Sequence, residues 1–144
     1  MSALEVTAAL VQGIESARYD LIVCNFANPD MVGHTGDLDA TIKAVEVVDQ
    51  GLGLAVAAIE RTNGAMVVFA DHGNCEMMVD PATGGAHTAH TLNQVPVYLV
   101  GSDAQLRTGG RLADIAPTAL ELLGIPQPDA MTGESLLRSK EDAA

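Results

Sequence analysis

A long amphipathic segment between two short apolar runs is the feature that most constrains the fold. Apolar residues recur every three or four positions from Leu38 to Ile59, which predicts a helix that ends near Asn63. Residues 19–26 contain four consecutive apolar side chains and predict a buried strand, and residues 65–70 predict a second one. A strand, a helix and a strand in this order predict a right-handed parallel crossover.

Further patterns extend this α/β arrangement. Residues 95–100 predict a third strand, in which Pro96 indicates a strand start or a sheet edge. Asp114 is expected to cap a helix that has Pro117 in its first turn, and Ser2 and Glu5 have the spacing of a capping box. We therefore predict a mainly parallel sheet flanked by helices. A helix before the first strand indicates that the domain is incomplete.

Composition limits the classes of function. The 144 residues are 48% hydrophobic, which suffices for the core of one domain. A net charge of −12 argues against nucleic acid and anionic membranes as partners, because both are bound through lysine and arginine. The sequence shows no membrane-spanning stretch and no signal pattern. Cys24 and Cys75 lack CxxC spacing, which is typical of reduced thiols, so we predict a cytoplasmic protein.

All four histidines lie in loops next to the predicted strands, together with two aspartates. This set comprises Asp30, His34, Asp71, His72, His87 and His90. Loops at the carboxyl ends of parallel strands converge, so we expect these side chains to meet. Carboxylate oxygen and imidazole nitrogen suit manganese, zinc, iron or cobalt. The spacing alone leaves two alternatives: an Asp-His pair can be a turn or a cap, and Cys75 can be a ligand or a partly buried thiol.

The predicted site lacks other parts that phosphoryl chemistry needs. Residues 19–42 and 62–106 contain no lysine or arginine, so no guanidinium group is available there to orient an anion. No GxSxG motif marks an activated nucleophile, and Thr35, Thr88 and Thr91 are interpreted as structural hydroxyls.

Three motifs carry a family resemblance. The segments NFANPDMVGHTG (residues 25–36), ADHGN (70–74) and HTAHT (87–91), the last followed by Val95 and Pro96, closely resemble the cofactor-independent phosphoglycerate mutases of the alkaline phosphatase superfamily. The resemblance implies an alkaline-phosphatase-like fold. It also implies an isomerase of glycolysis and gluconeogenesis that interconverts 3-phosphoglycerate and 2-phosphoglycerate through a phosphoserine, with two divalent ions, commonly Mn²⁺.

The resemblance also implies roles for individual residues. Asp30, His34 and His90 would hold one metal, and Asp71 and His72 would hold part of the second. His90 is preferred to His87 because the superfamily pattern places the ligand six residues before the proline. His87 would then support the site or only its local loop.

The chain also departs from the family. Family members are much longer, and their nucleophilic serine, a further aspartate ligand and the arginines that grip phosphoglycerate lie outside this sequence. Residues 1–137 thus resemble the C-terminal part of the phosphatase-like metal domain, and residues 138–144 form a charged tail. We expect no activity from the chain alone, a requirement for the missing N-terminal part, and self-association through an uncovered sheet edge.

Two other functions stay open on the sequence. A phosphatase or sulfatase-like hydrolase of the same superfamily would share Asp-His-Gly but would not need the loop at residues 28–36 in this form. A non-catalytic assembly module would keep the metal site without the chemistry.

Overall fold

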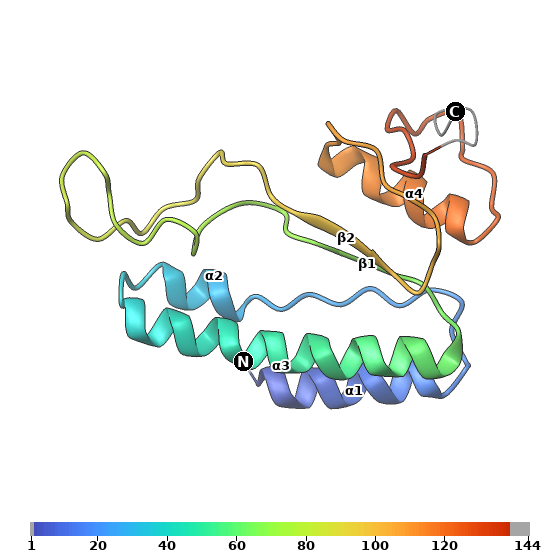
Figure 1. Cartoon of the computed structure of the whole chain (residues 1–144), viewed down its shortest axis with the longest axis horizontal. Coiled ribbons are helices and arrows are strands. Elements are labelled where there is room, and N and C mark those ends of the chain that lie inside the picture. Colours follow the sequence, from blue (N-terminus) through green and yellow to red (C-terminus); the bar gives the residue numbers. More distant parts are fainter. Residues whose placement is uncertain (1, 139–144) are drawn as a thin grey trace.

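The computed structural model describes residues 2–138 and consists of helices around a small sheet (Figure 1). The elements, in chain order, are α1 (Ala3–Glu15), α2 (Asn28–Gly33), α3 (Leu38–Thr62), β1 (Met66–Phe69), β2 (Val97–Val100), the 3₁₀ helix η1 (Leu112–Asp114) and α4 (Ile115–Leu122). Helix α1 packs against the C-terminal half of α3, and α2 packs near the start of α3. The histidine-bearing loops extend from the end of the β-ribbon that is nearer α2.

Helix α3 follows its sequence signals closely. The Asp37 side chain accepts a hydrogen bond from the Ala40 N–H at 2.9 Å and so caps the first turn. Asn63 ends the helix in the left-handed conformation, with φ of 53°. Ala55 and Ala58 are buried at 1% and 0% exposure, and these small residues let neighbouring elements approach closely. The predicted helix and its end are therefore confirmed.

The sheet has two strands, and they are antiparallel. Met66 pairs with Val100 and Phe69 with Val97. Strands were predicted in both places, and Pro96 does lie just before β2. The mainly parallel arrangement is not confirmed, because the two described strands pair in antiparallel orientation.

The strand predicted at residues 19–26 is absent, and the parallel crossover that depended on it is absent as well. This segment has no regular secondary structure in the structure. Tyr19, Leu21 and Val23 are 62%, 57% and 86% exposed. A strand forms only when its N–H and C=O groups have a neighbouring backbone to bond. Within residues 2–138 no strand pairs with this segment, so its apolar sequence alone does not make a strand.

The chain is open for its size. Its accessible surface is 9636 Å², whereas a folded monomer of 14.9 kDa exposes about 7,000 Å². Large apolar side chains account for part of the excess, among them Leu92 and Tyr98 at 105% and 60% exposure. The incomplete domain stays a prediction. None of the described helices is long and apolar enough to cross a bilayer.

Asp114 organises the C-terminal region. It is 3% exposed, and its carboxylate accepts hydrogen bonds from the Arg111 N–H at 3.0 Å, the Glu134 N–H at 2.9 Å and the Arg107 guanidinium at 3.1 Å. Asp114 is the N-cap residue of α4, as predicted, but its side chain makes no capping hydrogen bond to that helix and bonds to groups outside it. The bond from the Glu134 N–H, aided by the Arg111 N–H and Arg107, lowers the pKa of Asp114 although burial opposes this.

We expect Asp114→Asn to lower the free energy of unfolding by about 2 kcal/mol at pH 7, because the neutral amide loses charged hydrogen bonds. The folded pKa lies below the unfolded value, so the carboxylate's contribution is present above the unfolded pKa and disappears as pH falls through the folded pKa. Urea denaturation at pH 7 and at about pH 2 should show the deficit shrinking in acid. Asp103→Asn, at an exposed aspartate, is the matched control. An equal deficit of Asp114→Asn at both pH values would contradict this account.

Candidate metal site

Helix α2 carries the first two residues of the site. Asp30 lies in its first turn and His34 follows its last residue. A spacing of four places the two side chains on one helix face. The His34 Nε2 atom is 3.2 Å from Asp30 Oδ1.

The loop before β2 brings a third residue to the same point. His90 Nε2 lies 3.0 Å from Asp30 Oδ1 and 3.1 Å from His34 Nε2. One ligand atom from each of Asp30, His34 and His90 lies within 4.8 Å of the others. The structure therefore gathers the three residues that the resemblance assigned to one ion.

A backbone carbonyl sets the tautomer of the neutral His34 ring. The His34 Nδ1 atom is 2.6 Å from the Thr88 carbonyl oxygen, which can only accept a hydrogen bond. Nδ1 therefore carries the proton in the neutral ring, and Nε2 presents its lone pair to Asp30 and His90. Metal-binding histidines are commonly oriented in this way.

The donor set fits a divalent cation. Asp30 Oδ1 is buried and has no hydrogen-bond partner, which is costly for a carboxylate. Two atoms that bind one first-row cation at about 2.1 Å lie about 3 Å apart or somewhat more. The separations of 3.0 to 3.2 Å between Asp30 Oδ1 and the two imidazole nitrogens are close to this value. A cation at this point would satisfy the carboxylate oxygen and both lone pairs.

Asp71 and His72 lie beside this cluster. The His72 and His90 rings stack, with centroids 3.7 Å apart and planes 20° apart. His72 Nε2 is 3.7 Å from Asp71 Oδ1 and 4.0 Å from Asp30 Oδ1. The Asp71 side chain is 65% exposed. Two of the ligands implied for a second ion are thus adjacent to the first group and open to further partners.

His87 lies in a different part of the loop between β1 and β2. Its backbone N–H donates to the Met78 carbonyl at 3.0 Å, next to a bridge between Val79 and Ala86. The pKa of nearby Asp80 is lowered, first by the Ala82 N–H and last by His87. The geometry places His90, and not His87, with Asp30.

The loop after His72 supports α2 through contacts that the sequence did not reveal. The Cys75 thiol donates to the Pro29 carbonyl at 3.0 Å, and a Cβ atom on Gly33 would overlap the Asn74 amide oxygen. Burial, followed by the negative charges of Asp30 and Glu76, raises the pKa of Cys75. Cys75 is half-buried and bonded to α2, which favours the second of the two alternatives that the sequence left open.

Glu76 is a second residue that sequence reasoning missed. Its carboxylate bonds to Asn74, Thr91 and Asn93, and the bond from the Thr91 hydroxyl is the main cause of its lowered pKa. The partners Thr91 and Asn93 are 15 and 17 residues away, and no motif or periodic pattern in the sequence predicts such a pairing.

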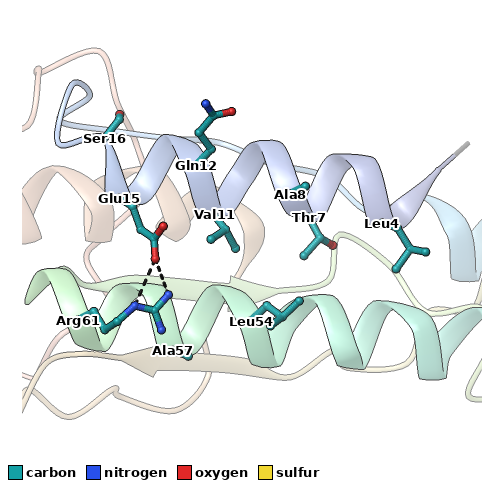
Figure 2. Close-up of a pocket in the computed structure, with 10 residues that line it drawn as sticks. All are labelled: Leu4, Thr7, Ala8, Val11, Gln12, Glu15, Ser16, Leu54, Ala57 and Arg61. Carbon is teal, nitrogen blue, oxygen red and sulfur yellow. Dashed lines mark hydrogen bonds and ion pairs between the residues drawn. The ribbon is translucent and has the colours of Figure 1, made fainter.

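A groove of about 640 Å³ between α1 and α3 lies apart from the histidines (Figure 2). Leu4, Val11 and Leu54 give it an apolar lining, and an ion pair between Glu15 and Arg61 lies at one end. It brings no group of metal ligands together.

Comparison with known proteins gives the superfamily of this chain. Residues 1–127 match the model of the metalloenzyme superfamily. The chain belongs to this superfamily. A 2,3-bisphosphoglycerate-independent phosphoglycerate mutase of Ruegeria sp. (strain TM1040) is 68% identical over 138 residues, which cover 95% of this chain and 27% of that protein. The corresponding protein of Gluconobacter oxydans (strain 621H) is 62% identical over 139 residues, covering 96% and 27%.

A solved phosphoglycerate mutase structure has the same fold. The Leishmania mexicana phosphoglycerate mutase, determined at low cobalt concentration, matches with a TM-score of 0.86 and 36% identity over 96% of this chain and 28% of that one. The family resemblance and the alkaline-phosphatase-like fold are thus confirmed. The chain spans about a quarter of the length of these relatives.

The contact between Gly33 and Asn74 can be tested by two glycine substitutions. Gly33→Ala should lower the free energy of unfolding by about 1–3 kcal/mol, because the added methyl group overlaps a buried side chain. Gly53→Ala in α3 meets nothing within 4 Å and should instead stabilise the chain by about 0.5–1 kcal/mol. Denaturation followed by circular dichroism measures both changes. Equal effects at the two positions would refute the proposed packing of α2.

Proposed function

We propose that this chain is the metal-bearing part of a phosphoglycerate mutase that interconverts 3-phosphoglycerate and 2-phosphoglycerate through a phosphoserine. The convergence of Asp30, His34 and His90 carries the proposal. It is supported by relatives of that name at 62% to 68% identity over nearly the whole chain. The activity would be that of an isomerase in glycolysis.

In this proposal Asp30, His34 and His90 hold one divalent ion, for which we propose Mn²⁺. The proposed second position uses Asp71 and His72 together with ligands from outside the chain. When bound, the ions supply charge stabilisation for the transferred phosphoryl group and lower the pKa of the attacking hydroxyl. The Thr88 carbonyl holds the His34 ring so that Nε2 faces the ion.

The proposed partner is the remaining, N-terminal part of the same enzyme. Residues 1–137 would be the C-terminal portion of the metal domain, and residues 138–144 a charged tail, of which 139–144 lie outside the described residues. The missing part would contribute the serine, further ligands and the arginines that hold phosphoglycerate. A strand from it would pair with residues 19–26 and complete a mainly parallel sheet, which would explain why this apolar segment lies exposed.

We also propose a cytoplasmic location. Cys24 and Cys75 are both free, which suits a reducing compartment. The proposed reaction is a step of glycolysis, which takes place there.

Metal content tests the proposed site. After incubation with Mn²⁺ and dialysis, the chain should retain nearer one ion than two, because three ligands of one site are assembled and the other site is partial. His34→Ala should abolish retention, while His87→Ala should preserve it. Elemental analysis gives the ratio. Two firmly held ions, or full retention in His34→Ala, would show that the ligands are misassigned.

Activity on phosphoglycerate tests the proposed reaction. The chain alone should show no turnover of 3-phosphoglycerate in an enolase-coupled assay, even with excess Mn²⁺, since loss of a nucleophile lowers rates by about a millionfold. Light scattering should show self-association through the exposed apolar surface. Adding a polypeptide that carries the N-terminal part of a relative should give a mixed complex and restore turnover.

Controls separate this proposal from its alternatives. His72→Ala should abolish the restored turnover. Turnover by the chain alone would contradict the proposed division of the enzyme. Release of inorganic phosphate without isomerisation in the mixture would indicate a hydrolase, and a mixed complex that binds metal without any turnover would indicate an assembly module.

A further inference from the structure

The loop that joins β1 to β2 must be held closed for the site to exist. It contains both His72 and His90 and has no helix or strand of its own. Two isolated bridges pair its limbs, Gly73 with Thr91 and Val79 with Ala86. Bringing the ends of such a loop together costs chain entropy, so local bonds between the limbs decide whether they stay in contact.

Glu76 adds a side-chain clamp at the first of these bridges. Its Oε2 atom accepts a hydrogen bond from the Asn74 N–H at 2.6 Å, on its own limb. Its Oε1 atom accepts from the Thr91 hydroxyl and, at 3.0 Å, from the Asn93 amide on the opposite limb. One carboxylate therefore joins the two histidine-bearing limbs.

The clamp lies next to the ligand atoms. The Thr91 N–H donates to the Gly73 carbonyl at 2.9 Å, so Gly73 and Thr91, the neighbours of His72 and His90, are in direct contact. A Cβ atom on Gly73 would overlap both the Thr91 hydroxyl and Glu76 Oε1, which shows how closely the limbs approach. The residues next to this contact, His72 and His90, stack their rings with centroids 3.7 Å apart.

We propose that Glu76 is a positioning residue that holds His90 against His72, and thereby places His90 Nε2 beside Asp30 Oδ1. The inference rests on the proposed function, because it assigns to Glu76 the assembly of that metal site. A carboxylate suits the task because it accepts several hydrogen bonds at once and donates none. Without it, the Gly73–Thr91 bridge alone would hold the limbs at this point.

The test measures ring stacking in the metal-free chain. The four histidines give four Cε1–H cross-peaks in a ¹H–¹³C spectrum, which single substitutions assign. Stacked rings shift each other's signals, so Glu76→Ala should move the cross-peaks of His72 and His90 and leave that of His87 in place. Circular dichroism confirms that the helices remain. Unchanged His72 and His90 signals in the folded variant would overturn the proposal.

Metal affinity is the second readout. Co²⁺ titration followed by visible absorption should show about tenfold weaker binding in Glu76→Ala and a changed d–d spectrum. Glu76→Gln, which keeps one acceptor oxygen, should fall between this variant and the unsubstituted chain. Asp80→Asn is the matched control, since Asp80 bonds within its own turn, to the Ala82 and Thr83 N–H groups. Equal affinity and spectra in all variants would contradict the role of Glu76.

A third substitution covers failure to fold. Thr91→Val keeps the shape of the side chain and removes the hydroxyl that donates to Glu76. It should shift the same two histidine cross-peaks, and unchanged signals would overturn the proposal.

If the unsubstituted chain shows stacked rings but binds no Co²⁺, the proposed metal site fails while the positioning role stands. If it binds Co²⁺ and the Glu76 variants match it in both readouts, only the positioning role fails.

Discussion

A buried carboxylate oxygen surrounded by imidazole nitrogens is the constraint on which the site depends. Asp30 Oδ1 lacks a hydrogen bond, and two Nε2 atoms lie 3.0 and 3.2 Å from it. A carboxylate oxygen without a donor is unfavourable where water cannot reach it, although the Asp30 side chain as a whole is 30% exposed. The surrounding elements hold it in place: α2 aligns Asp30 with His34, and the Thr88 carbonyl turns the His34 ring. Asp30, His34 and His90 therefore form a group that could hold a cation.

The chain is held together in two different ways. Helices α1 and α3 pack closely, since a Cβ atom on Gly51 of α3 would overlap the buried Thr7 hydroxyl of α1. The loops that carry His72 and His90 instead depend on hydrogen bonds between distant residues, with Glu76 on one limb and Thr91 on the other. Glu76 is exposed, so water weakens each bond to about 1 kcal/mol or less, and several bonds together oppose the entropy of loop closure. Packed helices therefore support the site, and hydrogen bonds between the limbs of the loop complete it.

The open surface follows from the same organisation. Leu21 and Val23 are exposed in an extended segment that lies between α3 and the β-ribbon in Figure 1. Relatives are almost four times longer than the stretch that this chain matches. Apolar side chains that look like a strand in the sequence can lie in solvent when the backbone that would pair with them belongs to another part of the protein. Exposure of this kind is expected to be relieved by association.

The sequence by itself determined the features that depend on residues close together in the chain. The period of α3, its end at Asn63 and the positions of β1 and β2 follow from local patterning, and the spacing of Asp30 and His34 places both on one helix face. Tertiary structure alone decided the antiparallel pairing, the exposed state of residues 19–26 and the closure of the loop by Glu76. The reason is physical: a strand needs a partner backbone, and a clamp needs donors brought from far along the chain. The Thr88 carbonyl that orients His34 is a backbone group, and every residue type carries one, so no sequence pattern could reveal its role.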